Sequence, residues 1–126
     1  MLVKSCIPVI PSADLEKSLR FWRDALGLSV DRAMRQDGRL VGCMVHNERL
    51  YVWLNQRAGS PTKPDDYEGI RLYWAPDDIR ALRERLLQHG YSVSEIVDRD
   101  YGQTEFVVTD DDGYSHCFGV ATTKSG

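Results

Sequence analysis

The sequence has few cysteines, and no two of them are closely spaced. Cys6, Cys43 and Cys117 are the only three, an odd number without a Cys-x-x-Cys motif. Small secreted domains that depend on disulfides carry more cysteines at regular spacings. The pattern therefore predicts free thiols and a cytoplasmic protein.

The sequence also lacks a long apolar run and an excess of basic residues. Its first segment, MLVKSCIPVIPSADLEKS, is interrupted by prolines and charges, unlike a signal peptide. No run approaches the length of a membrane span. With 16 Lys and Arg against 19 Asp and Glu, the net charge is -3, so no basic surface for nucleic acid is indicated. We expect neither a membrane nor a nucleic-acid partner.

The first half of the chain predicts a strand, a helix and three more strands. Residues 6–10 are apolar and predict the first strand, and Ser12 or Asp14 can cap the helix that follows. Large apolar side chains then recur at helical spacing: Leu15, Leu19, Trp22 and Leu26. Gly27 ends this helix. Strands separated by turns are expected after it: strands at 28–32, 40–45 and 50–54, turns at 34–39 and 46–49.

The second half repeats this order after a linker. Residues 57–68, RAGSPTKPDDYE, combine prolines, a glycine and charges. Then follow a strand at 70–74, a helix with apolar Ile79, Leu82 and Leu86, a short strand at 95–97, and a hairpin of strands at 104–109 and 114–119. The segment GYSV at 90–93 echoes GLSV at 27–30. These agreements indicate an internal duplication.

Motifs in both halves resemble a known family. PVIPSADL at 8–15, SLRFW at 18–22 and LGL at 26–28 resemble the opening of the glyoxalase / bleomycin-resistance / extradiol-dioxygenase superfamily, also called vicinal oxygen chelate. YG at 101–102, EF at 105–106 and DDDG at 110–113 resemble its second signature. Asp111 stands where that family usually has proline. The resemblance covers nearly the whole chain and is strongest to the bleomycin-resistance-like members.

The resemblance implies an α+β fold of two βαβββ modules. Their strands would form a curled mixed sheet with a U-shaped cleft, and the helices would cover its outer face. Residues 1–126 would be a single domain, with module 1 at about 3–56, the linker at 57–68 and module 2 at about 69–121. Two such chains would pair as a homodimer.

The resemblance also raises the question of a metal, because enzymes of this family hold a divalent ion through His, Glu or Gln on four strands. Carried over to this chain, those positions fall on Ile7, Trp53, Arg71 and Cys117. None is a family-type ligand, and a fixed cation such as Arg71 repels a metal ion. We therefore expect no metal and no cofactor.

The three histidines do not restore a metal site. His46 is expected in a turn and His89 at the end of the second helix, where a cation suits the helix dipole. His116 neighbours Cys117, so strand alternation turns its side chain to the opposite face. All three are expected to be surface or capping residues.

Alternation along the strands also defines the expected ligand-binding residues. This set consists of the four carried-over positions and of the residues that alternation places on the same face. Its members are Ile7, Tyr51, Trp53, Asn55, Arg71, Tyr73, Ser115 and Cys117. An aromatic and apolar lining suits a small organic ligand with a flat body. Arg71 can pair with a carboxylate or phosphate of that ligand, or form a salt bridge within the protein.

No residue of this set is expected to be catalytic. Glu105 is expected to have a structural hydrogen-bonding role, and no base is placed beside Cys117 to activate its thiol. The sequence therefore favours a binding protein of the bleomycin-resistance type, which sequesters an antibiotic or metabolite. Arg71 argues against bleomycin itself, which is cationic. The alternative is a metal-dependent glyoxalase, dioxygenase or thiol transferase with displaced ligands.

Overall fold

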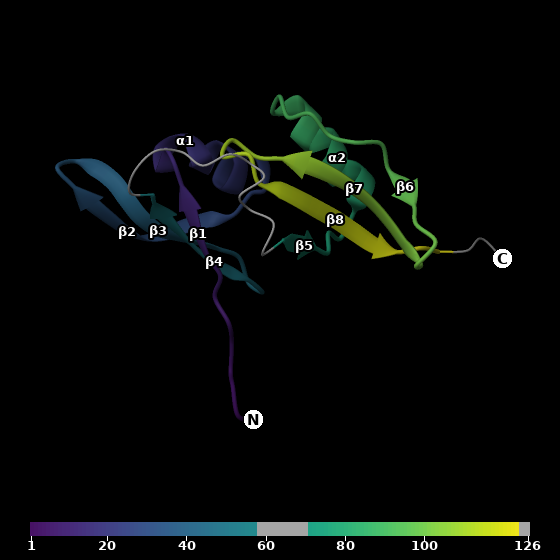
Figure 1. The fold of residues 1–126 in the computed structure, drawn as a ribbon, viewed down its shortest axis with the longest axis horizontal. Helices are drawn as coiled ribbons and strands as arrows, with labels where there is room; N and C mark the ends of the chain where they lie inside the picture. Colours follow the sequence, from purple (N-terminus) through teal and green to yellow (C-terminus); the bar gives the residue numbers. More distant parts are fainter. Residues whose placement is uncertain (58–70, 124–126) are drawn as a thin grey trace. The chain divides into compact units, whose positions relative to one another are not determined.

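The computed structural model describes residues 1–57 and 71–123. The chain divides into two compact units, Met1–Pro61 and Thr62–Gly126 (Figure 1). Each contains a four-stranded mixed sheet, and its elements follow the order strand, helix, three strands. This confirms the predicted α+β class and the two βαβββ modules. Of the linker expected at 57–68, only residue 57 lies within the described residues. That the chain is a single domain stays a prediction.

The first unit is a sheet with strand order β1-β4-β3-β2. β1 pairs in parallel with β4, and the other neighbours are antiparallel. Its elements are β1 Val9–Ser12, α1 Leu15–Leu19 with the π-helical segment Arg20–Ala25, β2 Ser29–Gln36, β3 Arg39–His46 and β4 Tyr51–Gln56.

Several boundaries in this unit differ from the sequence-based expectation. β1 begins at Val9 rather than at residue 6. The turn expected at 34–39 is present but shorter, because β2 and β3 leave only Asp37 and Gly38 between them. Both residues have positive φ, 53° and 77°, as a two-residue hairpin of this kind requires. His46 ends β3 instead of lying in the next turn.

The helix of the first unit is set by its cap and its apolar face. The Asp14 carboxylate, rather than Ser12, accepts the amide of Lys17 at 3.3 Å. Leu26 N donates to Phe21 O, five residues back, and Gly27 then takes φ 74°. The helical residues buried in the core are Leu15, Leu19, Phe21, Trp22 and Ala25, and those of β3 and β4 are Leu40, Cys43, Val45, Val52 and Leu54.

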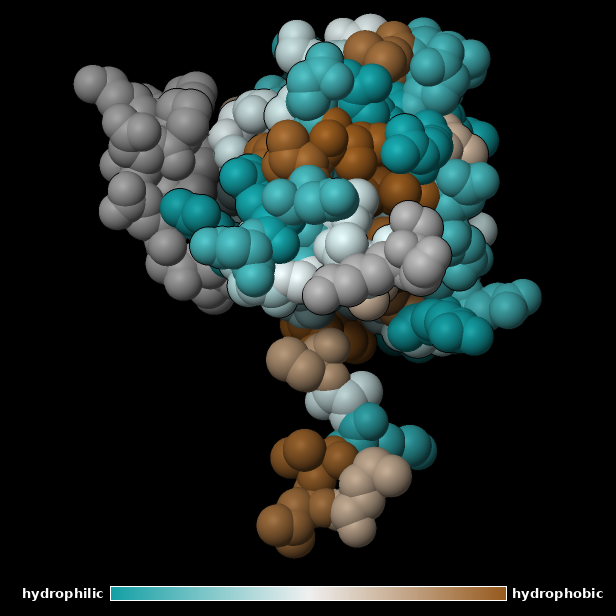
Figure 2. All heavy atoms as spheres, turned by 90° about the vertical axis from the view of Figure 1, so that its right-hand side faces the viewer, coloured by the Kyte–Doolittle hydropathy of each residue, from teal (hydrophilic) through white to brown (hydrophobic). Residues whose placement is uncertain are grey.

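The segment before β1 extends away from the sheet of its unit, as both views show (Figures 1 and 2). Its first residues, Met1, Leu2 and Val3, are apolar and exposed. They leave an apolar strip at the N-terminal end of the segment, which is brown in Figure 2.

The second unit is a sheet with strand order β5-β8-β7-β6, in which β5 pairs in parallel with β8. Its elements are β5 Leu72–Trp74, α2 Ile79–Gln88, β6 Val97–Asp98, β7 Gln103–Thr109 and β8 Ser115–Ala121. Asp78 caps α2 by accepting the Ala81 amide at 3.0 Å, and His89 is the residue at its C-terminal cap, as expected. Within the described residues, no helix is long and apolar enough to cross a membrane.

His116 lies in the core of this unit, so the expected surface or capping position is wrong for it. Its side chain is 1% exposed, between Trp74 Nε1 at 3.0 Å and Asp110 Oδ2 at 2.7 Å. An indole N–H can only donate, so His116 Nδ1 accepts and its Nε2–H donates to the carboxylate. This network fixes the orientation of the imidazole ring. The predicted orientation, away from Cys117, is confirmed.

The turn between β7 and β8 is organised by the second oxygen of Asp110. That oxygen accepts the backbone amides of Asp112 at 2.9 Å and Tyr114 at 3.0 Å. Gly113 has φ 89°, as the turn prediction required. Asp111, where the family usually has proline, accepts the Tyr91 hydroxyl at 2.6 Å. The acidic cluster is thus a turn tied to the core.

The buried histidine gives a prediction about stability. His116→Leu leaves the Asp110 carboxylate and the Trp74 N–H buried without their partner, so unfolding free energy should fall by about 3 kcal/mol. Urea denaturation with a constant m-value measures the loss. His89→Leu, the same change at a partly exposed helix end, is the matched control and should cost less than about 1 kcal/mol. Equal losses in the two variants would contradict the buried network.

Candidate functional site

In the first unit, β4 places three of the predicted ligand-binding residues on one sheet face. Val52 and Leu54 are buried at 4% and 0% exposure. Tyr51 and Asn55, which flank this stretch, are exposed, and Trp53 between the two buried residues is half-buried. The alternation predicted for this strand is confirmed, so Trp53 is not part of the helix-covered core. Whether these residues bind a ligand stays a prediction.

Two aromatic side chains on this face are held against their neighbours. A Cβ added to Gly42 would lie 2.8 Å from the Trp53 ring, so this ring covers the glycine backbone. Trp53 Nε1 also donates to Asn55 Oδ1 at 3.3 Å. Tyr51 stacks on His46 with ring centroids 5.5 Å apart. The rings are therefore fixed before any ligand arrives.

The residues around Trp53 make the face apolar. Across the sheet Trp53 lies between Val9 of β1 and Met44 of β3. Val9 is exposed and Met44 half-buried. Ile7 was expected on the first strand, but it precedes β1 and is exposed.

In the second unit, Tyr73, Ser115 and Cys117 share the face that points away from the core. Tyr73 pairs with Cys117 across β5 and β8, and the residues on either side of Cys117, His116 and Phe118, are buried. The predicted orientation of these side chains is confirmed. Arg71 directly precedes β5 and is exposed.

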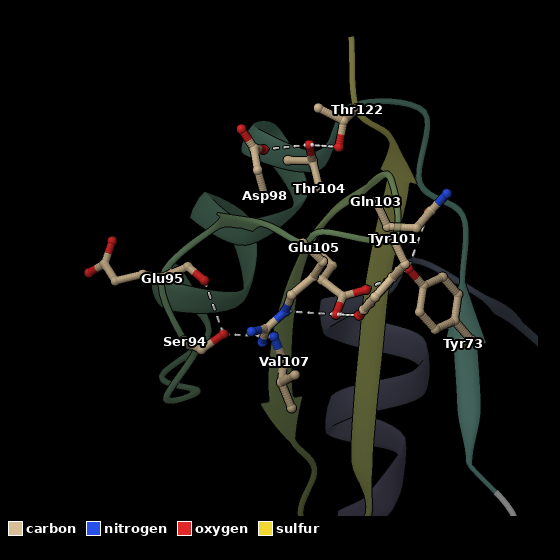
Figure 3. Close-up of polar contacts among 11 residues, drawn as sticks. Tyr73, Ser94, Glu95, Asp98, Tyr101, Gln103, Thr104, Glu105, Val107 and Thr122 are labelled. Carbon is tan, nitrogen blue, oxygen red and sulfur yellow. Dashed lines mark hydrogen bonds and ion pairs between the residues drawn. The ribbon is translucent and has the colours of Figure 1, made fainter. Parts of the chain in front are cut away.

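At the centre of this face lies Glu105 of β7, whose side chain is almost fully buried (Figure 3). Tyr73 Oη donates to Glu105 Oε2 at 2.6 Å, and the Tyr101 hydroxyl donates to Oε1. Arg99 Nε donates to the same Oε1 at 3.1 Å. Tyr73 in turn covers Gly119, where an added Cβ would lie 2.2 Å from the phenol oxygen. Three side chains thus enclose one carboxylate.

These contacts shift the pKa of each group in the cluster. Hydrogen bonds from Tyr101 and Tyr73 hold the Glu105 pKa below its usual range. The same bonds, lost if a phenol ionises, raise the pKa of Tyr73 well above its usual value and also raise that of Tyr101. Burial, followed by the charge of Glu105, raises the pKa of the Cys117 thiol to about 11. The groups are stabilised in their resting protonation states.

The sequence analysis named Glu105 only as a hydrogen-bonding residue and did not place Arg99 or Tyr101. The hydrogen-bonding role is confirmed by the contacts. The missed signal is the register of the hairpin: Val107 pairs with Cys117 and Glu105 with Gly119. Period-two alternation from Cys117 would have placed Glu105 on the same face.

The residues at the positions implied for a metal do not fit one. Of Ile7, Trp53, Arg71 and Cys117, only Cys117 can ligate, and a thiol with a pKa of about 11 is protonated at neutral pH. Among residues 1–57 and 71–123, no three His, Cys, Asp or Glu side chains are grouped to hold a metal ion. The absence of a bound metal stays a prediction.

Comparison with known proteins gives a family match and many structural matches. The model of the Glyoxalase/Bleomycin resistance protein/Dioxygenase superfamily matches residues 7–118. No curated protein sequence matches the chain.

Three solved structures illustrate the similarity of fold. A glyoxalase family protein from Enterococcus faecalis has TM-score 0.80 at 16% identity, covering 95% of this chain and 100% of that one. A glyoxalase-related enzyme from Clostridium phytofermentans has TM-score 0.77 at 22% identity, covering 97% and 98%. TnmS3, an antibiotic binding protein from Streptomyces sp. CB03234, has TM-score 0.72 at 19% identity, covering 97% and 100%. At these identities the likeness shows the fold.

The raised pKa of Cys117 predicts slow alkylation. With a pKa of about 11, about one thiol in a thousand is ionised at pH 8, so iodoacetamide should label Cys117 slowly. Glu105→Gln removes the neighbouring charge, and labelling should speed up about threefold for each unit by which the pKa falls. Peptide mass spectrometry measures both rates. Cys6, an exposed thiol, is the internal control, and an equal change at Cys6 would contradict the assignment.

The lowered pKa of Glu105 predicts a dependence of stability on pH. Because the folded-state pKa lies below the unfolded value of about 4.3, the stabilisation from the ionised carboxylate is complete above that pH. It is lost as the pH falls through the folded-state pKa. The difference in unfolding free energy between the wild type and Glu105→Gln should therefore shrink on acidification. Urea unfolding at a series of pH values tests this, and a constant difference would contradict it.

Proposed function

The chain belongs to the glyoxalase/bleomycin resistance protein/dioxygenase superfamily, and within it we propose a small-molecule-binding protein of the bleomycin-resistance type that sequesters an antibiotic or metabolite. The ligand-binding residues of this proposal are those predicted from strand alternation, with Glu105, Tyr101 and Arg99 added. In this proposal it acts as a homodimer, as the family resemblance implies, and in the cytoplasm, as the cysteine pattern predicts. The exposed apolar residues Met1, Leu2 and Val3 support contact with a second copy.

The observation that carries the proposal is the support of an aromatic ring by a glycine in each unit. Trp53 covers Gly42, and Tyr73 covers Gly119. Rings that are already fixed lose little freedom when a flat apolar molecule stacks on them, so binding costs less conformational entropy. Both rings lie on the sheet face that the unit's own core leaves uncovered.

The protonation states of the nearby groups favour binding over acid–base catalysis. A general acid or base works best with a pKa near the working pH. Glu105 has a lowered pKa, Tyr73 has a raised one, and Cys117 lies at about 11, so each is displaced away from neutrality. His116 is held in the core by Trp74 and Asp110. The Glu105 carboxylate is thus held ionised, and the Tyr73 hydroxyl and the Cys117 thiol are held protonated.

Among the structural relatives there is a precedent for a binding protein. TnmS3, which shares the fold, is an antibiotic binding protein, whereas the Clostridium phytofermentans relative is described as an enzyme. The fold therefore accommodates both classes. The protonation states described above support binding.

The proposal is tested by titrating the protein with a panel of planar aromatic antibiotics. Binding should quench tryptophan fluorescence, because Trp53 lies on the exposed face while Trp22 is fully buried. For a compound that quenches the fluorescence, Trp53→Ala should weaken the affinity about tenfold, as measured by calorimetry. Leu87→Ala, which removes an exposed apolar side chain from α2, is the matched control and should leave affinity unchanged.

Three results would contradict the proposal. One is that no compound of the panel binds, and another is that Trp53→Ala binds as tightly as the wild type. The third is conversion of a bound compound to a product, detected by mass spectrometry. Conversion together with near-stoichiometric Mn, Fe, Ni or Zn in protein purified without chelator or affinity tag would favour the metal-dependent alternative.

A further inference from the structure

The hydroxyl hydrogens of the two tyrosines in the Glu105 cluster are already used inside the protein. A phenol has a single hydrogen, and both Tyr73 and Tyr101 donate theirs to the Glu105 carboxylate. Their oxygens therefore have only lone pairs left to offer to a ligand. The two tyrosines are 54% and 63% exposed, so these lone pairs are within reach of solvent.

Gln103 adds a third acceptor. Its side-chain oxygen, Oε1, is the atom placed 3.2 Å from Tyr73 Oη. The phenol hydrogen belongs to the shorter, charge-assisted bond to Glu105, at 2.6 Å. The amide orientation that satisfies both groups therefore turns its NH₂ toward Tyr73 and its carbonyl away. The opposite orientation would set two acceptors against each other.

Arg99 is the competing group, because a guanidinium attracts anions. Its Nε is bound to Glu105 at 3.1 Å, and the ion pair places one positive charge against one negative charge. The other N–H groups of Arg99 are the donors that compete at this place, whereas the two phenol oxygens and the amide carbonyl of Gln103 offer acceptors. The aromatic rings add a further preference, since their faces attract cations.

We propose that Tyr73, Tyr101, Gln103 and Glu105 form a subsite for hydrogen-bond donors of the ligand, and that a protonated amine on an aromatic or apolar body is the preferred group. This inference rests on the proposed binding function and names its ligand class. A carboxylate or phosphate would meet lone pairs at this place and leave them unsatisfied. The preference is opposite to the one expected from Arg71 alone.

The test uses three probes with the same flat body: naphthylmethylamine, naphthylmethanol and naphthoate. Each is titrated into the full chain at neutral pH, and two-dimensional NMR gives the dissociation constants and the residues that shift. The amine should bind at least about tenfold more tightly than the carboxylate, with the alcohol between them. The largest shifts should fall on Tyr73, Tyr101 and Gln103.

Two variants and one control isolate the cause. Glu105→Gln replaces the carboxylate by an amide that can itself donate, so the phenol hydrogens are released and the ratio of amine to carboxylate affinity should approach one. Tyr101→Phe removes an acceptor at an exposed position, where folding is least affected, and should lower the ratio in part. Asp98→Asn removes one negative charge from β6, outside the cluster, and should leave the ratio unchanged.

Each outcome decides the inference. Equal or tighter binding of naphthoate to the wild type overturns it, and so does binding of none of the probes. An effect of Asp98→Asn equal to that of Glu105→Gln would mean that net charge alone sets the preference, which also overturns it. The proposed function fails separately, through the panel of antibiotics and Trp53→Ala.

Discussion

Each four-stranded sheet buries a single face against its own core, and this constraint decides where every other side chain lies. In the first unit it places Val52 and Leu54 inward and leaves Trp53 on the opposite face. In the second unit it places Phe118 inward and Cys117 outward. A shift of register by one residue would exchange the two sets, so the apolar pattern that folds the unit also selects the residues available to a ligand. The site is thus a consequence of how the core is built.

The carboxylates on the two faces of the second sheet show how burial controls polar chemistry. Asp110 on the core side accepts from His116 and from two backbone amides, while Glu105 on the other side accepts from two tyrosines and Arg99. Both are nearly inaccessible, and both are satisfied by several donors, as an ionised group removed from water requires. Each carboxylate already accepts three hydrogen bonds, so most of its capacity is used within the protein. The strongest charges of this unit therefore hold structure in place.

Much of the fold could be predicted from the sequence, because the spacing of apolar residues and the residues that cap helices and form turns are local signals. Helix spacing, the capping role of Asp14 and the hairpin turn ending at Gly113 each depend on residues close together in the chain. The buried position of His116 and the enclosure of Glu105 could not, because their partners lie up to 42 residues away or on another strand. The orientation of the His116 imidazole depends on an indole that no local pattern connects to it. Long-range polar contacts are set by strand pairing, which a single sequence leaves open.

The glycines beneath the two rings have a consequence for recognising such surfaces in other chains. Trp53 pairs with Met44, and Gly42 precedes Met44 by two residues in β3. Tyr73 pairs with Cys117, and Gly119 follows Cys117 by two residues in β8. In both units the ring leans diagonally over the neighbouring strand, so the glycine is offset by two from the residue opposite. An aromatic residue at the first position without glycine at the second would have to stand upright or turn away. The diagonal pair, rather than the aromatic residue alone, is the feature that a sequence comparison should follow.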